Sequence, residues 1–221
     1  ARRGEGGALQ IVGPAGVGKS RLVHEFLADA RAAGAVTLEM RCDSLDRDAS
    51  YVPVARALGE RLEAGRDAPG KAAGRADLLA EFQRILDEAG DMAGPIRKAL
   101  AAPQPPLREP GGETPSDPAQ RRRMLVDALV RIVLGLNGDG PLLVTFDDVH
   151  WADPGTASVL ARLVELSAAH PVLVVFTSRE TGAAVALPEG HIRTIDLGPL
   201  DPAHCRRLVA HLLGDHASDA G

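Results

Sequence analysis

The chain has 221 residues, of which 25 are lysine or arginine and 30 are aspartate or glutamate, giving a formal net charge of −5. This balance argues against a nucleic-acid surface, so we expect any DNA contact to come from a separate domain. No stretch approaches the roughly 18 apolar residues of a membrane helix, and the N-terminus lacks the apolar core of a signal peptide. The two cysteines, Cys42 and Cys205, form no C-x-x-C pair, so the sequence favours a cytoplasmic protein without membrane contact.

The first motif lies between a short apolar run, Leu9 to Val12, and an amphipathic stretch. Its sequence, Gly-Pro-Ala-Gly-Val-Gly-Lys-Ser, matches the pattern G-x-x-x-x-G-K-[ST] of a phosphate-binding P-loop. The glycines let successive backbone N–H groups face one anion, the lysine adds a positive charge, and the serine hydroxyl suits Mg²⁺. We therefore predict nucleotide binding by Gly13, Pro14, Ala15, Gly16, Val17, Gly18, Lys19, Ser20 and Arg21.

Helical patterns and short apolar runs alternate along the rest of the chain, which indicates an α/β fold. The predicted strands are 9–12, 36–40, 142–146, 172–176 and 192–197, and their apolar character is typical of strands buried on both faces of a parallel sheet. The predicted helices are 19–33, about 53–64, 76–89, 119–136, 155–169 and 202–213.

Two of the predicted helices carry clear local signals. In the first, apolar residues recur at spacings of three and four, and Gly34 marks its end. In the fifth, Asp153 is the expected N-cap and Pro154 occupies the first helical position. The apolar positions of the first helix are Leu22, Val23, Phe26, Leu27 and Ala30.

About a hundred residues separate the second and third predicted strands, too many for a simple crossover connection. We expect a helical insertion over residues 52–118 that ends in an exposed proline-rich loop, residues 103–118, which contains six prolines. A basic run, Arg121 to Arg123, follows it. A solvated helix end explains this run better than a phosphate or nucleic-acid contact.

The second motif is an apolar run, Leu142 to Phe146, that ends in two adjacent acids, the form of a Walker B element. Neighbouring carboxylates repel each other unless a cation or water lies between them, and a Mg²⁺–nucleotide supplies the cation. We expect Asp147 to hold Mg²⁺ together with Ser20, and Asp148 to orient or deprotonate the attacking water. The alternative, an acidic turn that caps the next helix, is disfavoured by the upstream P-loop.

The following predicted strand leads into Arg179. Parallel strands place their carboxyl ends on one edge of the sheet, so Arg179 would emerge beside the P-loop, where a guanidinium could contact the γ-phosphate or report its loss. Spacing alone does not separate this role from a surface arginine paired with Glu180. Because no second histidine or cysteine lies at ligand spacing, His150 and Trp151 indicate a packed loop rather than a metal site.

Three segments together resemble the STAND class of AAA-related ATPases, most closely the modules of large LuxR-type bacterial regulators and of proteins fused to class III adenylate cyclase or kinase domains. They are Gly13–Leu22, the string Asp-Asp-Val-His-Trp-Ala-Asp-Pro at 147–154, and Phe176–Glu180; Leu197–Leu200 fits as well. The resemblance spans about residues 8–213. It implies a P-loop NTPase with a five-stranded parallel sheet of order 5-1-4-3-2, ATP/ADP and Mg²⁺ as ligands, and γ-phosphate sensing by Arg179.

The same resemblance bears on domain organisation. The family usually carries a Gly-Arg-Glu segment upstream of the P-loop and a helical lid and winged helix downstream, and this sequence contains none of them. We therefore expect residues 1–221 to be the ATPase domain of a larger protein. Sensor and effector domains of the same polypeptide are the expected partners, and self-association stays open.

The resemblance implies a signal-transduction switch that binds ATP, hydrolyses it slowly and controls transcription. Two alternatives remain. One is a metabolic P-loop phosphotransferase, in which the insertion holds the acceptor and Arg121 to Arg123 clamp phosphates. The other is a module that binds nucleotide without turnover. A GTPase is disfavoured because the sequence has no Asn-Lys-x-Asp motif.

Overall fold

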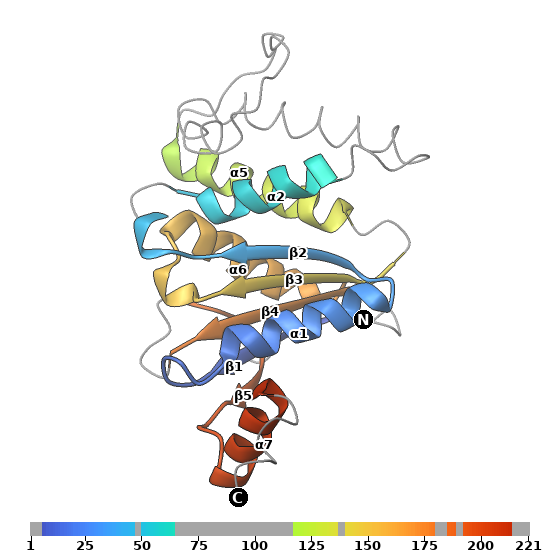
Figure 1. Cartoon of the computed structure of the whole chain (residues 1–221). Coiled ribbons are helices and arrows are strands. Elements are labelled where there is room, and N and C mark those ends of the chain that lie inside the picture. The colour runs from blue at the N-terminus through green and yellow to red at the C-terminus, as the bar shows by residue number, and fades with distance from the viewer. Residues whose placement is uncertain are drawn as a thin grey trace, which may run out of the picture.

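A five-stranded parallel sheet forms the centre of the computed structural model (Figure 1). The structure describes residues 6–46, 50–64, 117–136, 140–179, 185–188 and 192–213. The strands lie in the order β2-β3-β4-β1-β5, and every neighbouring pair is parallel. Counted from the other edge this is 5-1-4-3-2, so the predicted fold is confirmed. The strands are β1 (Gly7–Val12), β2 (Val36–Arg41), β3 (Leu142–Asp147), β4 (Val172–Ser178) and β5 (Ile192–Asp196).

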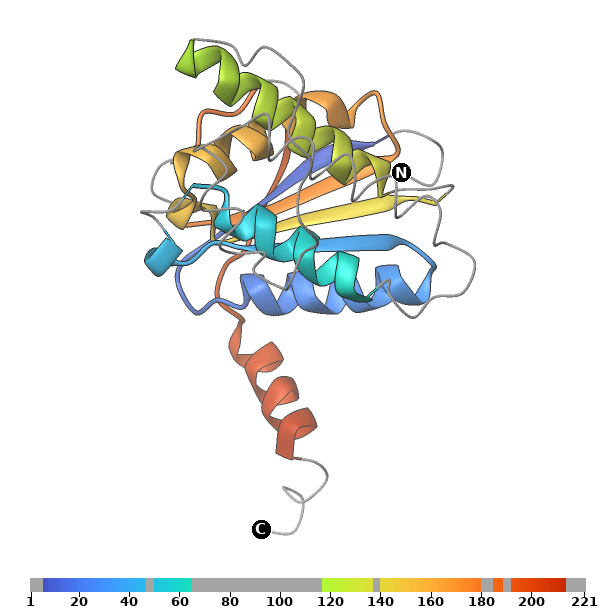
Figure 2. The same cartoon turned by 90° about the horizontal axis from the view of Figure 1, so that it is seen from above.

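Helices cover both faces of the sheet. In Figure 2, α1 lies on one face and α5 and α6 lie on the other, while α2 packs beside β2. The described helices are α1 (Lys19–Ala32), α2 (Val52–Ala64), α5 (Pro118–Gly135), α6 (Pro154–Ser167) and α7 (Pro202–Leu213). Among the residues described, no helix is long and apolar enough to cross a membrane.

Only the two ends of the predicted insertion are part of the described structure. The helix α2 begins it, and α5 follows it with Arg122 and Arg123 exposed near its start. The predicted helix 76–89 and the proline-rich loop before residue 117 lie outside the described residues.

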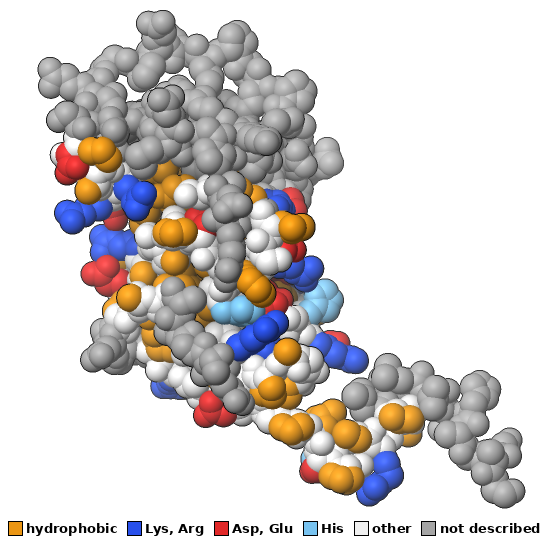
Figure 3. All heavy atoms as spheres, turned by 90° about the vertical axis from the view of Figure 1, so that its left-hand side faces the viewer, with side chains coloured by type: hydrophobic (Ala, Val, Ile, Leu, Met, Phe, Trp, Pro, Cys, Tyr) orange, Lys and Arg blue, Asp and Glu red, His pale blue; other side chains and the backbone are white. Residues whose placement is uncertain are grey.

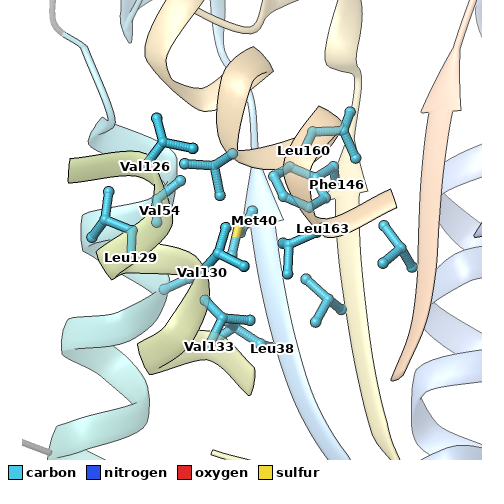
Figure 4. Packing of buried hydrophobic residues seen from close by; sticks show 14 of the residues in the cluster. Leu38, Met40, Val54, Val126, Leu129, Val130, Val133, Phe146, Leu160 and Leu163 are labelled. Carbon is cyan, nitrogen blue, oxygen red and sulfur yellow. The ribbon is translucent and has the colours of Figure 1, made fainter. Parts of the chain in front are cut away.

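The larger core lies between the sheet and the helices α2, α5 and α6 (Figure 4). Alternate residues of a strand point to the same face, so Val144 and Phe146 of β3 point to this side together with Val174 and Phe176 of β4. Each fully buried aliphatic or aromatic side chain contributes about 1.5–3 kcal/mol. Helix and strand side chains that meet here include Leu38, Met40, Val54, Val126, Leu129, Val130, Val133, Leu160 and Leu163.

A smaller core lies under α1 on the opposite face. Val23 and Leu27 of α1 pack there against Ile11, Leu143 and Val175 of the sheet. The odd-numbered residues of β3 and β4 therefore face α1, which begins at the P-loop.

Two expectations about burial are corrected by the structure. The apolar positions of α1 are not all in the core, because Leu22 and Phe26 remain 42% and 41% exposed on the side of the helix turned from the sheet. The strand β5 is not buried on both faces, since residues 193–196 are exposed. The strand lies at the edge of the sheet, and α7 projects away from the layered body (Figures 1 and 2) instead of covering it.

Candidate functional site

The P-loop joins the end of β1 to the start of α1, at the edge where the strands end. Gly16 and Gly18 have φ angles of 77° and 105°, a left-handed conformation that favours glycine. At Gly13 the constraint is space, because a Cβ atom would lie 2.4 Å from the backbone oxygen of Leu197. The loop sequence thus fits the curled backbone that turns successive N–H groups toward one point.

The side chain of Lys19 is folded onto this loop. It is buried, with 6% of its surface exposed, and its Nζ donates to the backbone oxygens of Gly13 at 2.7 Å and Pro14 at 2.9 Å. No carboxylate pairs with it among the described residues. An ammonium has three donors, and a buried charge is costly unless a counter-charge lies nearby. The loop and Lys19 therefore fit a bound anion such as a phosphate group.

The first acid of the Walker B element lies directly beside the start of α1. The hydroxyl of Ser20 donates to Oδ1 of Asp147 at 3.1 Å, across 127 residues of sequence. A hydroxyl and a carboxylate are hard oxygen ligands, and Mg²⁺ bound with a nucleotide uses one or two carboxylates plus phosphate and water. This pair fits the ion, and no cluster of three or more His, Cys, Asp or Glu in the described structure offers another metal site.

The second acid points in a different direction from the first. Asp148 has φ 56° and ψ 50°, a left-handed conformation that aspartate tolerates better than most residues. Its Oδ1 lies 3.8 Å from Nδ1 of His150, and 40% of its side chain is exposed. His150 in turn packs on Trp151 with ring centroids 5.1 Å apart. The packed loop expected from the sequence is present beside Asp148, whose side chain is partly exposed to solvent.

Arg179 lies at the same edge of the sheet. It comes directly after β4, the strand between β1 and β3, and its side chain is exposed. Its alternative partner, Glu180, lies outside the described residues. Figure 3 views this edge and shows basic, acidic and histidine side chains gathered near its middle. The roles assigned to Lys19, Asp148 and Arg179 stay predictions.

Asp153, the predicted N-cap of α6, also holds the start of α2. Its Oδ1 accepts hydrogen bonds from the backbone N–H groups of Gly155 and Thr156, which confirms the cap. The same oxygen also accepts from the backbone N–H of Tyr51 at 3.0 Å. Its Oδ2 accepts from the hydroxyl of Thr156 at 2.5 Å. The ring of Tyr51 lies over Gly155, where a Cβ atom would come within 2.7 Å of it. Burial raises the pKa of the Tyr51 phenol above the ordinary value for tyrosine.

Replacing Asp153 by alanine is expected to lower the free energy of unfolding by about 2–4 kcal/mol, because buried donors at two helix starts lose their acceptor. The matched control is Asp117→Ala at α5. Asp117 is an exposed N-cap that accepts one bond, from the N–H of Ala119, so about 1 kcal/mol or less should be lost. Urea denaturation of both variants checks this, and equal losses would contradict the buried double cap.

Sequence reasoning missed two residues of this region. Thr177, the sixth residue of β4, hydrogen-bonds to both acidic residues at the end of β3. Tyr51, directly before α2, joins the start of that helix to the loop after the acids. The partners of Thr177 lie 29 and 30 residues away and that of Tyr51 lies 102 residues away, so local spacing carries no trace of them. For Thr177 one signal was available in the sequence, because it is a polar residue at the end of an apolar strand and shares the strand face of Val175.

Comparison with known proteins gives one curated relative, the uncharacterized protein R02095 of Rhizobium meliloti (strain 1021). It is 29% identical over 213 residues, which cover 96% of this chain and 20% of the relative. The chain thus spans about a fifth of the length of that relative.

Similar solved structures include Drosophila ORC bound to DNA, with 14% identity, a TM-score of 0.47, and coverage of 92% of this chain and 40% of that one. Another is cbiO1 from Clostridium perfringens, part of the ABC transporter complex cbiONQ. It has 14% identity and a TM-score of 0.35, and the match covers 80% of this chain and 68% of cbiO1. Similarity at this level assigns no function.

The family model of the AAA ATPase domain matches residues 1–175. That range contains the P-loop, both acids and most of β4. The chain therefore belongs to the AAA ATPase domain family and is an AAA-type P-loop module.

Proposed function

We propose that this chain is the ATP-dependent switch module of a multidomain signal-transduction regulator of the STAND class, with transcription control of the LuxR type as its output. The observation that carries the proposal is the contact between Ser20 and Asp147, because it joins the phosphate loop to the acidic strand end in one site. The length of the curated relative, of which this chain covers 20%, supports a module within a larger regulator.

Each residue has a defined part in this proposal. The loop N–H groups and Lys19 bind the phosphates, and Ser20 and Asp147 hold Mg²⁺, which neutralises phosphate charge when bound. Asp148 orients the attacking water or takes its proton, and its exposure to solvent leaves room for that water. Arg179 contacts the γ-phosphate from the neighbouring strand end.

A switch needs a difference in binding between its two states. A nucleotide that binds both arrangements of the neighbouring domains equally well shifts nothing. The γ-phosphate is what distinguishes ATP from ADP, so the residues that contact it must do so better in one state. Lys19 and Arg179 are the candidates. Lys19 is buried in the phosphate loop. Arg179 is exposed at the sheet edge, where a neighbouring domain could move the arginine side chain.

A turnover assay tests the proposal. Phosphate release from Mg²⁺–ATP should be acceptor-independent and slow, about 10⁻² s⁻¹ or less, as in other P-loop switches. The same assay with alcohols, nucleosides and sugars added should show no phosphorylated product. Acceptor-dependent transfer would instead establish a phosphotransferase, and tight ATP binding without any release would establish a module that binds but does not turn over.

A further inference from the structure

The hydroxyl of Thr177 lies between the two acidic residues that end β3. Thr177 is fully buried, with 0% of its surface exposed, and lies on the α1 side of the sheet like Val175. Its Oγ1 is 2.6 Å from Oδ1 of Asp147 and 2.8 Å from the backbone nitrogen of Asp148. One buried oxygen therefore contacts both acids.

The chemistry of these partners fixes the direction of both hydrogen bonds. A backbone N–H can only donate, so the Thr177 oxygen accepts from Asp148. The single hydroxyl hydrogen is then directed to Asp147, and the 2.6 Å separation is typical of an O–H donor on an ionised carboxylate. The arrangement has one orientation, and it requires Asp147 to be the acceptor.

This contact determines how the Asp147 carboxylate is presented. Ser20 donates to the same oxygen at 3.1 Å, so both hydrogen bonds formed by this carboxylate within the described residues end on Oδ1. The carboxylate is held from the β4 side and from the α1 side. Its Oδ2 remains as the oxygen for a cation.

The same hydroxyl fixes the backbone of Asp148. Asp148 is one of two non-glycine residues with positive φ among those described, and such a conformation is kept only when its surroundings hold it. The bond from its N–H to Thr177 anchors the first atom of that residue. The left-handed backbone turn at Asp148, directly after Asp147, therefore depends on Thr177.

We propose that Thr177 is a positioning residue of the nucleotide site, which sets the Asp147 carboxylate for Mg²⁺ and the Asp148 backbone for its left-handed turn. This inference rests on the proposed function, because it gives the acids their predicted roles. The rival explanation is a buried hydroxyl that only stabilises the junction of β3 and β4. The positioning role and the purely structural role predict different results for nucleotide binding. Loss of a positioning residue changes the dependence of binding on Mg²⁺, whereas loss of a purely structural hydroxyl does not.

The test compares Thr177→Val, which removes the hydroxyl, with Thr177→Ser, which keeps it. A fluorescent ATP analogue is titrated at increasing Mg²⁺ and again in EDTA. Thr177→Val should raise the Mg²⁺ concentration at the midpoint about 10- to 100-fold, the usual effect of losing a group that orients a metal ligand. Thr177→Ser should stay within about threefold of wild type, and affinity in EDTA should be the same for all three because the P-loop is intact.

Ser178→Ala is the matched control. It also removes a buried hydroxyl of β4, but that hydroxyl accepts from Nε2 of Gln10 and contacts neither acid, so the midpoint should not move. If Thr177→Val does not fold, Thr177→Cys decides instead, since a thiol is a weak donor and acceptor and should give an intermediate shift. An unchanged midpoint in the folded variant overturns the inference, even if urea denaturation shows lower stability.

The outcome also separates this inference from the proposed function. If Mg²⁺ strengthens the binding of the analogue by the wild-type protein, and the Thr177→Val variant has the same midpoint, the positioning role alone is overturned. A wild-type protein without any Mg²⁺ dependence overturns the assignment of Ser20 and Asp147 and the inference with it.

Discussion

Replacing Lys19 by alanine is expected to abolish nucleotide binding, with a rise in the dissociation constant of about 100-fold or more. Each hydrogen bond to a charged group contributes about 1.5–3 kcal/mol, and tenfold in affinity corresponds to about 1.4 kcal/mol. An ammonium has three donors, so the loss of two such bonds to phosphate already costs about 100-fold in affinity. Lys19 is buried and its only partners within the described structure are two loop carbonyls, so a phosphate would be its first counter-charge. Calorimetric titration with ATP measures the change.

Two further variants show whether charge at this position is the cause. Lys19→Met keeps the apolar stem and removes the ammonium, so it should lose as much affinity as the alanine variant. Arg31→Ala removes a positive charge from the far end of the same helix, where Arg31 bonds to Thr37 and Glu39, and should change the dissociation constant by no more than about twofold. Wild-type affinity in Lys19→Met would contradict the predicted role of Lys19.

The strands were predictable because burial leaves a strong mark on short apolar runs. The structure extends four of the five predicted strands by one or two residues each and ends the fifth one residue earlier, and the apolar centre of each is where the sequence places it. The order of the strands in the sheet could not be predicted from the spacing of apolar residues. It followed from the resemblance carried by the P-loop and the Asp-Asp-Val-His-Trp string, and the structure confirms it. The burial of β5 was overestimated, because an edge position depends on strand order and not on local composition.

The candidate site divides in the same way. The P-loop, the acid pair and Arg179 were predicted together because each follows a strand, and parallel strands bring their carboxyl ends to one edge. The contacts of Thr177 and of Tyr51 were not predicted, because each depends on which strand or helix packs beside which. The pattern around α1 shows the converse error: Leu22 and Phe26 match helical spacing as well as Val23 and Leu27 do, yet only the second pair faces the sheet.

Replacing Asp148 by asparagine is expected to preserve ATP binding and to lower the hydrolysis rate by about 100-fold or more, the usual contribution of a positioned general base. The substitution keeps the size of the side chain, and asparagine tolerates the left-handed conformation at φ 56° as well as aspartate does. The backbone bond to Thr177 is also retained, because it uses the N–H and not the side chain. The fall should therefore appear in kcat, with the dissociation constant of ATP within about twofold of wild type.

Asp127→Asn is the control for this variant. Asp127 is an exposed carboxylate of α5 that pairs with Arg162 of α6, so its loss removes one negative charge without touching the strand ends. Hydrolysis by the Asp127 variant should match wild type. If the Asp148 variant also hydrolyses ATP at the wild-type rate, Asp148 is not the base, and the attacking water must be oriented by another group at the same edge. Arg179 would then be the next residue to replace, because it follows β4, the strand between β1, which leads into the P-loop, and β3, which carries Asp147.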